Sequence, residues 1–460
     1  MATKYDLIVV GAGPGGCTAA KFAAQRKLKV LLLERAKNPG EKNMSGSYLF
    51  KPICEECFPG FKDAEFHKGM PRWGGIDFRW ALDNDEKVYG FYMGPGSDTM
   101  RDQYSVFRDE TDNWFTKQAV KAGAELKTAL ATDVIWDTKG TEKRVIGVVT
   151  DVGNFEAPIT IDASGLHSLI ANRSGLAKWH KDKIMLGLKY IYKVDPKVLR
   201  ERMQPYKDTD GVDVDWGVAP MLCGSNPDHF GCHATAMPDR GIVSIAYYWS
   251  LSEGIEHRVN VHQRAQWYLK QPQVARLIEG GEFVQCNFHG LAAGDIVGYV
   301  KKSYLPGLLL VGDAGGFGQP VDNYGANVAM WQGKLAGNLA AEMKEKMDYS
   351  EAMFAKYEEA WRESWVGDDD VHELCVWLRD GSMNELFWTI DSVVDGAIRA
   401  KWNDRTYPEI VLAAIPKLVK ALPSMQTLLY GLKGITRTGL KKAEPFAAML
   451  KMLSPGPDQK

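Results

Sequence analysis

The first 35 residues show an ordered pattern of apolar and polar positions. An apolar run of strand length covers Asp6–Val10 and breaks into a glycine-rich segment. A segment rich in alanine and other helix formers follows at Cys17–Gln25, and a second apolar run at Lys29–Leu33 ends at the acid Glu34. The pattern predicts strand, tight turn, helix and strand, the order of a dinucleotide-binding βαβ unit.

The glycine-rich segment has the spacing G-x-G-x-x-G. Gly11 allows the tight turn, Gly13 lets a pyrophosphate approach the backbone, and Gly16 lets the helix pack close to the strands. The helix N-terminus directs free N–H groups at the phosphates. Glu34 is placed to accept hydrogen bonds from ribose hydroxyls and would repel the 2′-phosphate of NADP. A purely structural turn is the alternative, but the flanking strands, helix and acid all favour the nucleotide site. The segment reads Gly11-Ala12-Gly13-Pro14-Gly15-Gly16.

The next segments extend this domain. Residues 104–107 are predicted to be extended, and Arg108 after them suits a phosphate clamp, with a solvated surface residue as the alternative. We expect Thr111 to cap a helix that ends at Gly123. Its expected buried side chains are Trp114, Phe115, Ala119 and Val120. Further strands are predicted at residues 125–130, 134–136, 145–150 and 159–161.

The pattern changes at residues 184–300. Apolar runs at Met185–Tyr192, Gly241–Trp249 and Phe283–Asn287 are separated by turns rich in Asp, Gly and Pro. This predicts a mostly antiparallel sheet, inserted into the dinucleotide domain. The predicted fold is therefore α/β, with a discontinuous cofactor domain (1–180 and 300–345), a substrate domain (181–299) and a helical C-terminal region (346–460).

The chain then returns to the first domain. Gly307–Val311 is a predicted buried strand that ends at Asp313, and a helix is predicted from about Ala326 to Lys344. A second acid at a strand end is not needed for a nicotinamide cofactor, whereas it can accept hydrogen bonds from the ribityl hydroxyls of a flavin. The dipole at the start of the last helix would stabilise a reduced, anionic flavin ring. The helix also carries a face of small residues that permits close approach: Ala329, Gly333, Ala336 and Ala340.

Composition narrows the functional class. The 460 residues are 45% hydrophobic and 25% charged, as in a soluble globular protein, and the net charge of −2 gives no reason to expect nucleic-acid binding. We expect no signal peptide and no membrane-spanning segment. Seven scattered cysteines favour a reducing, cytoplasmic location and do not form a four-cysteine cluster. Cys54 and Cys57 are either a redox or metal pair or, as we favour, two small residues of a short helix; no metal site is predicted.

The C-terminal region has a composition of its own. Residues 350–380 are predicted to be helical, with aromatic and apolar side chains interspersed with acids. In residues 408–453 the composition changes: the segments Ile410–Leu422 and Met425–Leu453 combine Leu, Ile and Met with seven basic residues and one acid, Glu444. Such a stretch suits peripheral contact with a membrane or a partner protein, or else a helix that covers the core.

These motifs together resemble one FAD flavoprotein superfamily. It contains p-hydroxybenzoate hydroxylase-like enzymes, geranylgeranyl reductases and electron-transfer-flavoprotein:quinone oxidoreductases, and the chain is most similar to the FixC-type branch of the last group. The resemblance covers roughly residues 4–345. The motifs that carry it are the glycine turn with Glu34, the loop Lys42–Gly46, Arg108, Asp162-x-x-Gly165-x-x-Ser168 and Leu310–Ala314.

The resemblance implies FAD as the cofactor and assigns residues to it. Those expected to bind FAD are Gly11, Gly13, Pro14, Gly15, Gly16, Glu34, Arg35, Lys42, Asn43, Met44, Ser45, Gly46, Arg108, Ala131, Thr132, Ala163, Gly165, Ser168, Gly312, Asp313, Gly325, Ala326 and Asn327. Four histidines could donate protons, although each is more often structural: His167, His229, His233 and His289. No catalytic residue is assigned.

Three functions fit the resemblance. The first is electron transfer between an electron-transfer flavoprotein or ferredoxin-like partner and a lipophilic quinone. The second is reduction of prenyl C=C bonds. The third is a flavin-bearing subunit of a larger electron-transfer complex. The region His229–Ala234 departs from the substrate strand of geranylgeranyl reductases, which counts against the second function, and it leaves the substrate region of the FixC type unmatched as well.

Overall fold

The computed structural model describes 14 stretches of the chain. All of them belong to one unit that ends at Gly367. The described residues are 5–41, 47–67, 76–82, 87–93, 103–138, 143–178, 180–181, 184–202, 206–207, 213–214, 219–224, 231–292, 302–317 and 325–367.

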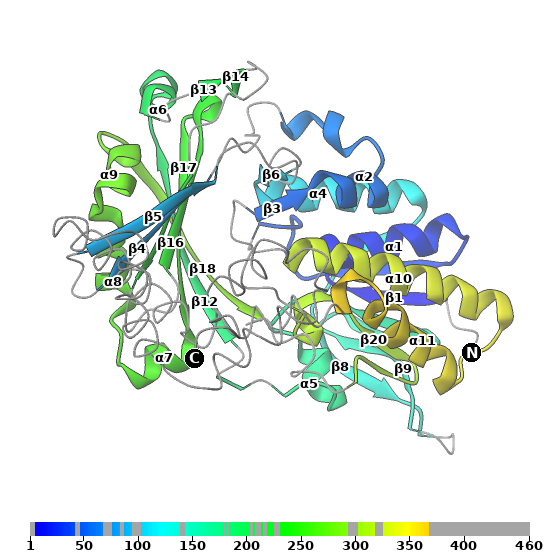
Figure 1. The fold of residues 1–460 in the computed structure, drawn as a ribbon. Helices are drawn as coiled ribbons and strands as arrows, with labels where there is room; N and C mark the ends of the chain where they lie inside the picture. The colour runs from blue at the N-terminus through cyan, green and yellow to red at the C-terminus, as the bar shows by residue number, and fades with distance from the viewer. Residues whose placement is uncertain are drawn as a thin grey trace, which may run out of the picture. The chain divides into compact units, whose positions relative to one another are not determined.

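A six-stranded sheet organises the first half of the fold (Figure 1). The predicted βαβ unit is present as β1 (Leu7–Val10), α1 (Pro14–Gln25) and β2 (Val30–Glu34). The strand order is β19-β20-β11-β1-β2-β7, and β1 pairs in parallel with both β2 and β11. The other strands are β7 (Glu125–Thr128), β11 (Ile159–Asp162), β19 (Tyr304–Leu305) and β20 (Leu308–Leu310).

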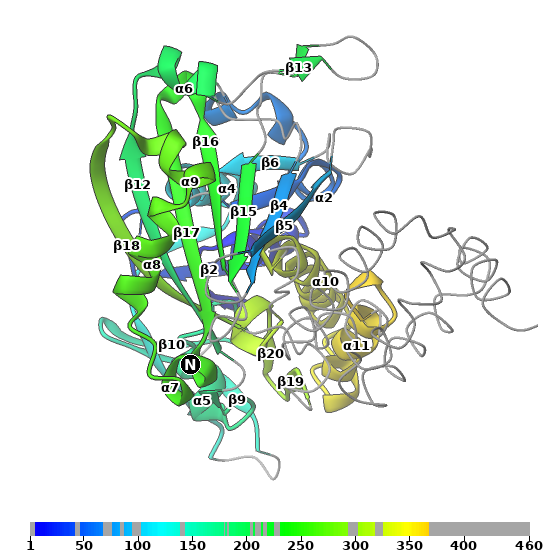
Figure 2. The ribbon, with the colours of Figure 1, turned by 60° about the vertical axis from the view of Figure 1, so that its left-hand side comes forward.

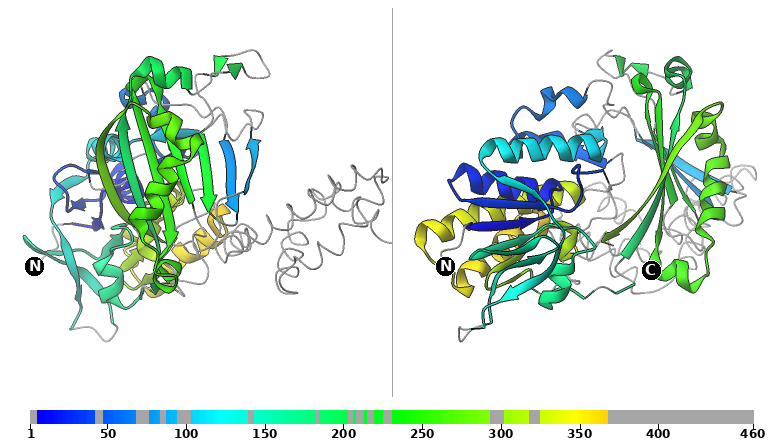
Figure 3. Two further views of the ribbon diagram at one scale, coloured as in Figure 1. Left: turned by 90° about the vertical axis from the view of Figure 1, so that its left-hand side faces the viewer. Right: turned by 180° about the vertical axis from the view of Figure 1, so that it is seen from behind.

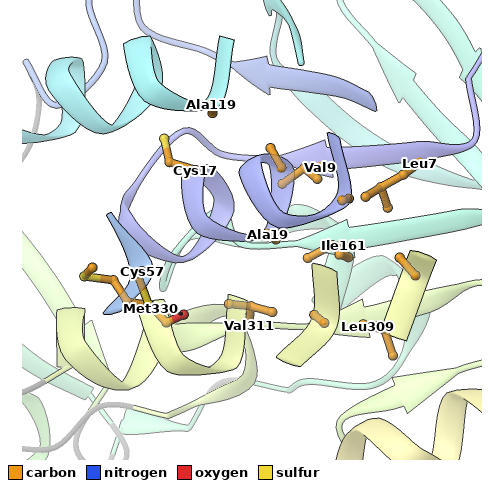
Figure 4. Packing of buried hydrophobic residues seen from close by; sticks show 14 of the residues in the cluster. Leu7, Val9, Cys17, Ala19, Cys57, Ala119, Ile161, Leu309, Val311 and Met330 are labelled. Atoms are coloured by element: carbon orange, nitrogen blue, oxygen red, sulfur yellow. Dashed lines mark hydrogen bonds between the residues drawn. The ribbon is translucent and has the colours of Figure 1, made fainter. Parts of the chain in front are cut away.

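Both faces of this sheet are covered, which explains its unbroken apolar runs. Leu7 and Val9 face a core formed with the helices, while Ile8 and Val10 face a core formed with a three-stranded sheet. Figure 4 shows the helical side, where Cys17 and Ala19 of α1 lie between the strands and the neighbouring helices. The helical side holds α2 (Lys51–Cys57), α4 (Arg108–Ala122), α10 (Gly325–Lys346) and α11 (Glu351–Arg362). The other side holds β8 (Ala131–Trp136), β9 (Val145–Thr150), β10 (Gly153–Glu156) and α5 (Leu169–Ser174).

The predicted small-residue face of α10 packs against α1. A Cβ atom at Gly333 would lie 2.2 Å from the Gly15 carbonyl oxygen, and one at Gly337 would lie 2.5 Å from that of Ala19. The close approach is therefore between two helices, and it fixes the N-terminal end of α1.

A seven-stranded sheet forms the second half, in the order β18-β12-β17-β16-β15-β4-β5 (Figure 2). The predicted antiparallel sheet is confirmed, except that β15 pairs in parallel with β4. The strands are β4 (Ile76–Leu82), β5 (Lys87–Met93), β12 (Ile184–Lys193), β15 (Ala219–Gly224), β16 (Gly231–Met237), β17 (Ile242–Ser250) and β18 (Glu282–Ala292).

One part of the domain division is corrected. Strands β4 and β5 lie within residues 1–180, which were assigned to the cofactor domain, but hydrogen bonding to β15 places them at the edge of the second sheet. The hydrophobic pattern of β4 and β5 does not show which of the two sheets they join, because that depends on pairing with β15, more than 130 residues away in the sequence.

Helices cover one face of the seven-stranded sheet (Figures 1 and 3). Helix α8 (Val261–Lys270) and helix α9 (Pro272–Ile278) pack there on alternate side chains of the strands, among them Leu188, Tyr190 and Ile245. The remaining helices of this half are α6 (Pro196–Arg202) and α7 (Leu251–Glu256). Two short pairs complete the strands, β3 (Ser47–Phe50) with β6 (Gln103–Val106) and β13 (Tyr206–Lys207) with β14 (Asp213–Val214). Single 3-10 turns lie at η1 (Phe61–Asp63), η2 (Glu65–His67), η4 (Pro238–Arg240), η5 (Gly312–Gly315) and η6 (Trp365–Gly367).

Two details of the predicted helix after residue 107 were wrong. The helix begins at Arg108, so Thr111 lies in its first turn and its hydroxyl donates back to the Phe107 carbonyl, which is the usual i−4 bond of a helical threonine. Val120 is 44% exposed, although Phe115 and Ala119 are buried as expected. Gly123 ends the helix with a φ of +115°, as predicted.

The predicted C-terminal region is described only in part. Helix α11 lies within the predicted helical segment, and it buries Phe354, Tyr357 and Trp361. The basic amphipathic stretch 408–453 lies outside the described residues. Across the described part of the chain, none of the helices combines the length and apolar character that a bilayer crossing requires.

Candidate functional site

The glycine turn has the geometry that its spacing predicts. Gly11 has a φ of +98°, which favours glycine, and a Cβ atom there would lie 2.5 Å from the Ala163 carbonyl oxygen. A Cβ atom at Gly16 would lie 1.9 Å from the Gly11 carbonyl oxygen. One at Gly13 would meet only Arg108, whose Nη2 atom is 3.7 Å away. Gly11 and Gly16 are therefore required for the tight packing of the turn, while Gly13 faces open space.

The N-terminus of α1 presents unpaired backbone donors to that space. Gly13 is its N-cap residue, with an extended backbone and no side-chain cap, and Pro14 takes the first helical position. The first turn carries no acid. The free N–H groups and the positive end of the helix dipole thus form an anion site of the kind that holds a pyrophosphate.

Arg108 lies beside this anion site at the start of α4. Its Nε and Nη2 atoms donate to the two carboxylate oxygens of Asp112 at 2.9 and 2.8 Å, and the Asp112 side chain is fully buried. Burial acts to lower the Arg108 pKa, but the carboxylates of Asp112 and Asp313 act more strongly, and the pKa is raised. Arg108 is therefore positively charged, and Asp112 fixes the position of its guanidinium. Asp112 was not among the residues predicted from the sequence, although the i,i+4 spacing of Arg108 and Asp112 indicates the pair.

Glu34 is fixed at the carboxyl end of β2. One carboxylate oxygen accepts from the Ala12 N–H at 2.9 Å, and the other accepts from the Ala36 N–H at 2.8 Å. These bonds orient the carboxylate beside the glycine turn and leave lone pairs for further donors, as ribose hydroxyls would be. Arg35, the next residue, is exposed.

Asp313 lies in η5, directly after β20. Asp313 is half-buried, and its Oδ2 atom accepts from the Ala292 N–H of β18 at 3.5 Å. Burial raises its pKa, against the opposing effects of that N–H group and Arg108. Gly312 donates its N–H to Gln332 Oε1 at 2.9 Å, so α10 holds this turn in place. The buried Nε2 atom of Gln332 has no hydrogen-bond partner in the described part of the chain.

Two other predicted residues of α10 are placed at its start. Asn327 is fully buried, and its Oδ1 atom accepts from the Phe50 N–H at 2.9 Å. Gly325 and Ala326 form the first turn of the helix. Asn327 therefore ties α10 to β3, and its role beside a flavin ring stays a prediction.

The Asp162–Ser168 segment closes the end of β11 with internal bonds. The carboxylate of Asp162 accepts from the hydroxyls of Ser164 and Ser168 and from the Ala171 N–H, while burial raises its pKa. Ser168 is 2% exposed and caps α5. Ala163 lies under Gly11. Gly165, with a φ of +79°, has open space where a Cβ atom would lie. Ser168 thus has a structural partner set, and its predicted contact with the cofactor remains untested.

The last predicted positions divide into two groups. Ala131 and Thr132 begin β8, where Ala131 is buried and the Thr132 hydroxyl donates to the Val149 carbonyl at 3.4 Å. Just before them, the Ala129 N–H donates to the Glu34 carbonyl at 2.9 Å, which places this strand near the end of β2. The predicted loop Lys42, Asn43, Met44, Ser45 and Gly46 lies outside the described residues.

Cys54 and Cys57 have the structural environment that we favoured. Both are free, buried thiols of α2. Burial raises the pKa of both, to about 12 for Cys57. Thiols of this kind are unreactive at neutral pH.

Comparisons with known proteins show which proteins this chain is similar to. The family described as FAD dependent oxidoreductase matches residues 6–180. Protein FixC of Escherichia coli K12 is 25% identical over 436 residues, which cover 94% of this chain and 98% of that protein. This chain is a FAD-dependent oxidoreductase related to the FixC proteins. Protein FixC of Bradyrhizobium diazoefficiens is 28% identical over 365 residues, or 75% of this chain and 77% of that protein.

Solved structures confirm the predicted p-hydroxybenzoate hydroxylase-like fold class. A geranylgeranyl bacteriochlorophyll reductase-like protein from Thermoplasma acidophilum matches with a TM-score of 0.66 at 23% identity, covering 91% of this chain and 98% of that one. The flavin-dependent brominase Bmp2 matches with a TM-score of 0.63 at 18% identity, covering 90% and 99%. At these identities the likeness concerns the fold.

The geometry fits FAD, which supplies hydride and single-electron chemistry when bound. The α1 N-terminus and Arg108 suit its pyrophosphate, Glu34 suits the adenosine ribose, and Asp313 suits the ribityl chain. Gly13 provides the cradle, because its missing side chain leaves the space through which the phosphates would approach the backbone. The strands β1, β2 and β20 run parallel, so their carboxyl ends lie at the same edge of the six-stranded sheet. Arg108 of α4 lies next to Gly13 at this edge.

Proposed function

We propose that this flavoprotein transfers electrons between an electron-transfer flavoprotein or ferredoxin-like partner and a lipophilic quinone. The observation that carries the proposal is the relation to the FixC proteins over nearly the whole of both chains. That relation extends through the second sheet, where specificity for a substrate would reside, and not only through the FAD-binding residues 6–180.

The cysteines support a separate electron donor. The sequence has seven, with a single C-x-x-C pair, and both members of that pair are buried in α2. A four-cysteine iron–sulfur cluster of recognisable spacing is thus not encoded in this chain. Electrons would reach the flavin from another protein, and FAD suits this role because it exchanges electrons singly or in pairs.

Reconstitution tests the proposal. The purified protein, loaded with FAD, is mixed with reduced electron-transfer flavoprotein and then with a short-chain ubiquinone or menaquinone. We expect the flavin absorbance to bleach with the first addition and to return with the second, with quinol formed in proportion. Bleaching without reoxidation by any quinone would contradict the quinone role.

A prenyl reductase is the second candidate, and the structural likeness to the geranylgeranyl reductase-like protein favours it. Incubation of the dithionite-reduced protein with a geranylgeranyl lipid distinguishes the two. If mass spectrometry detects saturated product and the first experiment yields no quinol, the function is C=C reduction and not electron transfer to a quinone.

A flavin-bearing subunit of a larger complex is the remaining alternative. Co-purification in a fixed complex, with photoreduction of the flavin but no turnover by the isolated protein, would support it.

A further inference from the structure

The two faces of the seven-stranded sheet have different environments. Side chains alternate along a strand, so residues of one parity share a face. One face packs under α8 and α9 through Leu188, Tyr190 and Ile245. On the opposite face, Met237 of β16 and Ile242 of β17 pack against Phe107, the residue before α4. That face therefore looks towards the FAD-binding half, in agreement with the arrangement in Figure 3.

Lys189 lies on the face that looks towards the FAD-binding half. It is in the middle of β12, opposite Ala246 of β17 on one side and Asn287 of β18 on the other. The side chain is only 2% exposed. Within the described part of the chain, it forms no hydrogen bond and no ion pair. A buried lysine without a partner is rare, because an unpaired ammonium is costly to remove from water.

The nearest charged groups do not compensate Lys189. Burial, and to a smaller extent the positive charge of Arg108 in α4, lowers the Lys189 pKa to about 7. His289 of β18 is opposite Gly187, two residues from Lys189, and its ring lies 6.3 Å from the ring of His167. Burial first, and then the charges of Arg108, His167, Arg35 and Lys189, lower the His289 pKa to about 4. The groups closest to Lys189 are therefore cations or neutral bases, and none of them neutralises its charge.

The remaining titratable groups around this face have other roles. Asp112 is paired with Arg108, and Asp313 accepts from the Ala292 backbone. Tyr248 of β17 is on the same face, and burial raises its pKa. His233 occupies the register position opposite Ala246 on β16. Neither Asp112, Asp313 nor Tyr248 is in an ion pair with Lys189 in the part of the chain that the structure describes.

A second polar group on this face is also unsatisfied. Ser244 is opposite Ile191 of β12, one position along the face from Lys189. Its hydroxyl is buried and has no hydrogen-bond partner among the described residues. The protein thus leaves both a base and a hydroxyl uncompensated on the face towards the FAD-binding residues. Such groups are retained when a ligand or a change of charge uses them.

We propose that Lys189 is the proton acceptor of this site: its Nζ atom takes a proton from solvent when two electrons enter, and returns it when they leave. The lone pair of the neutral amine forms the new N–H bond, and the electrons come from the reductant, which is dithionite in the experiment below. Negative charge that arrives beside a buried amine stabilises the ammonium, since Coulomb interactions are strong where water is excluded. The proposal depends on FAD binding and not on the partner or the quinone.

Proton uptake during reduction tests this role. FAD-loaded protein at pH 8, in weakly buffered solution with a pH indicator, is reduced stoichiometrically with dithionite. The wild type is expected to take up about one proton more per flavin than Lys189→Met, after correction for the protons of dithionite itself. Lys193→Met is the matched control, because Lys193 is at the exposed end of the same strand, and its uptake should equal that of the wild type.

A second measurement does not depend on the variant keeping its native structure. In protein labelled with ¹³C at lysine Cε, the resonance of Lys189 should move from the neutral to the protonated position when the wild-type holoprotein is reduced at pH 8. Equal proton uptake by wild type and Lys189→Met, or a Lys189 resonance that does not respond to reduction, would overturn the proposal. Failure of the quinone experiment would leave these results unaffected.

Discussion

The glycines of the turn differ in what surrounds them: Gly11 and Gly16 are enclosed by backbone atoms, and Gly13 is not. A Cβ atom at Gly16 would overlap the Gly11 carbonyl, whereas one at Gly13 would touch nothing closer than 3.7 Å. Gly13 also has a φ of −77°, which any residue can adopt. The spacing of the motif predicts a separate role for each of these glycines, and the three-dimensional contacts distinguish Gly13 from Gly11 and Gly16 in the same way.

Gly13→Ala is therefore predicted to lower FAD affinity without destabilising the apoprotein. The new methyl group would occupy the path of the pyrophosphate, and we expect the Kd for FAD to rise by about tenfold or more, equivalent to about 1.4 kcal/mol. The apoprotein melting temperature should remain within about 1 °C of the wild type. Fluorescence titration with FAD and differential scanning calorimetry measure the two quantities.

Gly16→Ala is the comparison for this experiment. It should lower the melting temperature of the apoprotein by several degrees, because backbone atoms must move to admit the methyl group. Equal melting temperatures for the two variants would contradict the assignment of Gly16 to packing and Gly13 to the ligand.

Lys189 makes stability depend on pH in a direction that can be worked out. Its pKa falls from 10.5 in the unfolded chain to about 7 in the fold, so the folded state binds this proton less tightly. Folding therefore loses stability as pH falls from 10.5 towards 7, and the loss is complete below 7. One pKa unit corresponds to about 1.4 kcal/mol, which makes the full effect about 5 kcal/mol.

Lys189→Met is predicted to be more stable than the wild type at pH 7, with a difference that shrinks as the pH rises to 10. Denaturant unfolding of the apoproteins at the two pH values gives the comparison. Lys193→Met, at the exposed strand end, should show no pH-dependent difference of this size. A constant difference between Lys189→Met and wild type would show that lost packing, and not the charge, is being measured.

At the scale of elements, the sequence predicted those whose pattern is local. The βαβ unit, the buried strand before Asp313 and the helix after Gly325 are all present, because continuous apolar runs, glycines and caps act within a few residues. The parts that could not be predicted depend on distant partners. Strands β4 and β5 join the second sheet only through β15. Lys189 is significant only because it lies on the face of the second sheet that packs against Phe107, the residue before α4. A lone lysine in the middle of an apolar strand was nevertheless visible in the sequence.

The same distinction applies to the candidate site. Gly11, Gly16 and Glu34 were placed correctly from spacing, since the turn and the strand end are contiguous in the sequence. Asp112 was missed because its function is to hold another side chain. For Ser168, the motif gave a position but not a role, and the structure surrounds it with bonds to Asp162 and Ala171.

Helix α10 controls the position of α1 through its glycines. Gly333→Val would force side-chain atoms into the Gly15 carbonyl, which a Cβ atom alone would approach to 2.2 Å. We expect the melting temperature to fall by at least 5 °C and FAD affinity to weaken, because Gly15 belongs to the first turn that receives the phosphates. Asn338→Ala, on the same helix, should change neither quantity appreciably. Loss of stability with unchanged FAD affinity would show that α1 does not transmit the displacement.

On the scale of the whole molecule, the two sheets meet through a small set of contacts around Arg240. Its guanidinium donates to both oxygens of Glu110 in α4, at 2.8 and 3.1 Å, and to the Phe66 carbonyl at 2.9 Å. It also lies 5.7 Å from the centre of the Phe107 ring. Arg240 follows β16, whose Met237 contacts the same ring, and it therefore links the second sheet to the helix that begins with Arg108.

Arg240→Met is predicted to loosen the second sheet from the FAD-binding half. The substitution keeps the apolar part of the side chain but leaves Glu110 without its cation, which should cost about 2 kcal/mol. We expect bound FAD to be released at a lower temperature than in the wild type, as measured by the rise of flavin fluorescence on heating. The matched control is Arg200→Met, which removes a neighbouring ion pair to Asp239 whose side chains are 40% and 48% exposed. Exposed pairs contribute little, so this control should release FAD at the wild-type temperature. If both variants behaved alike, the contact at Glu110 would have no special part in joining the two sheets.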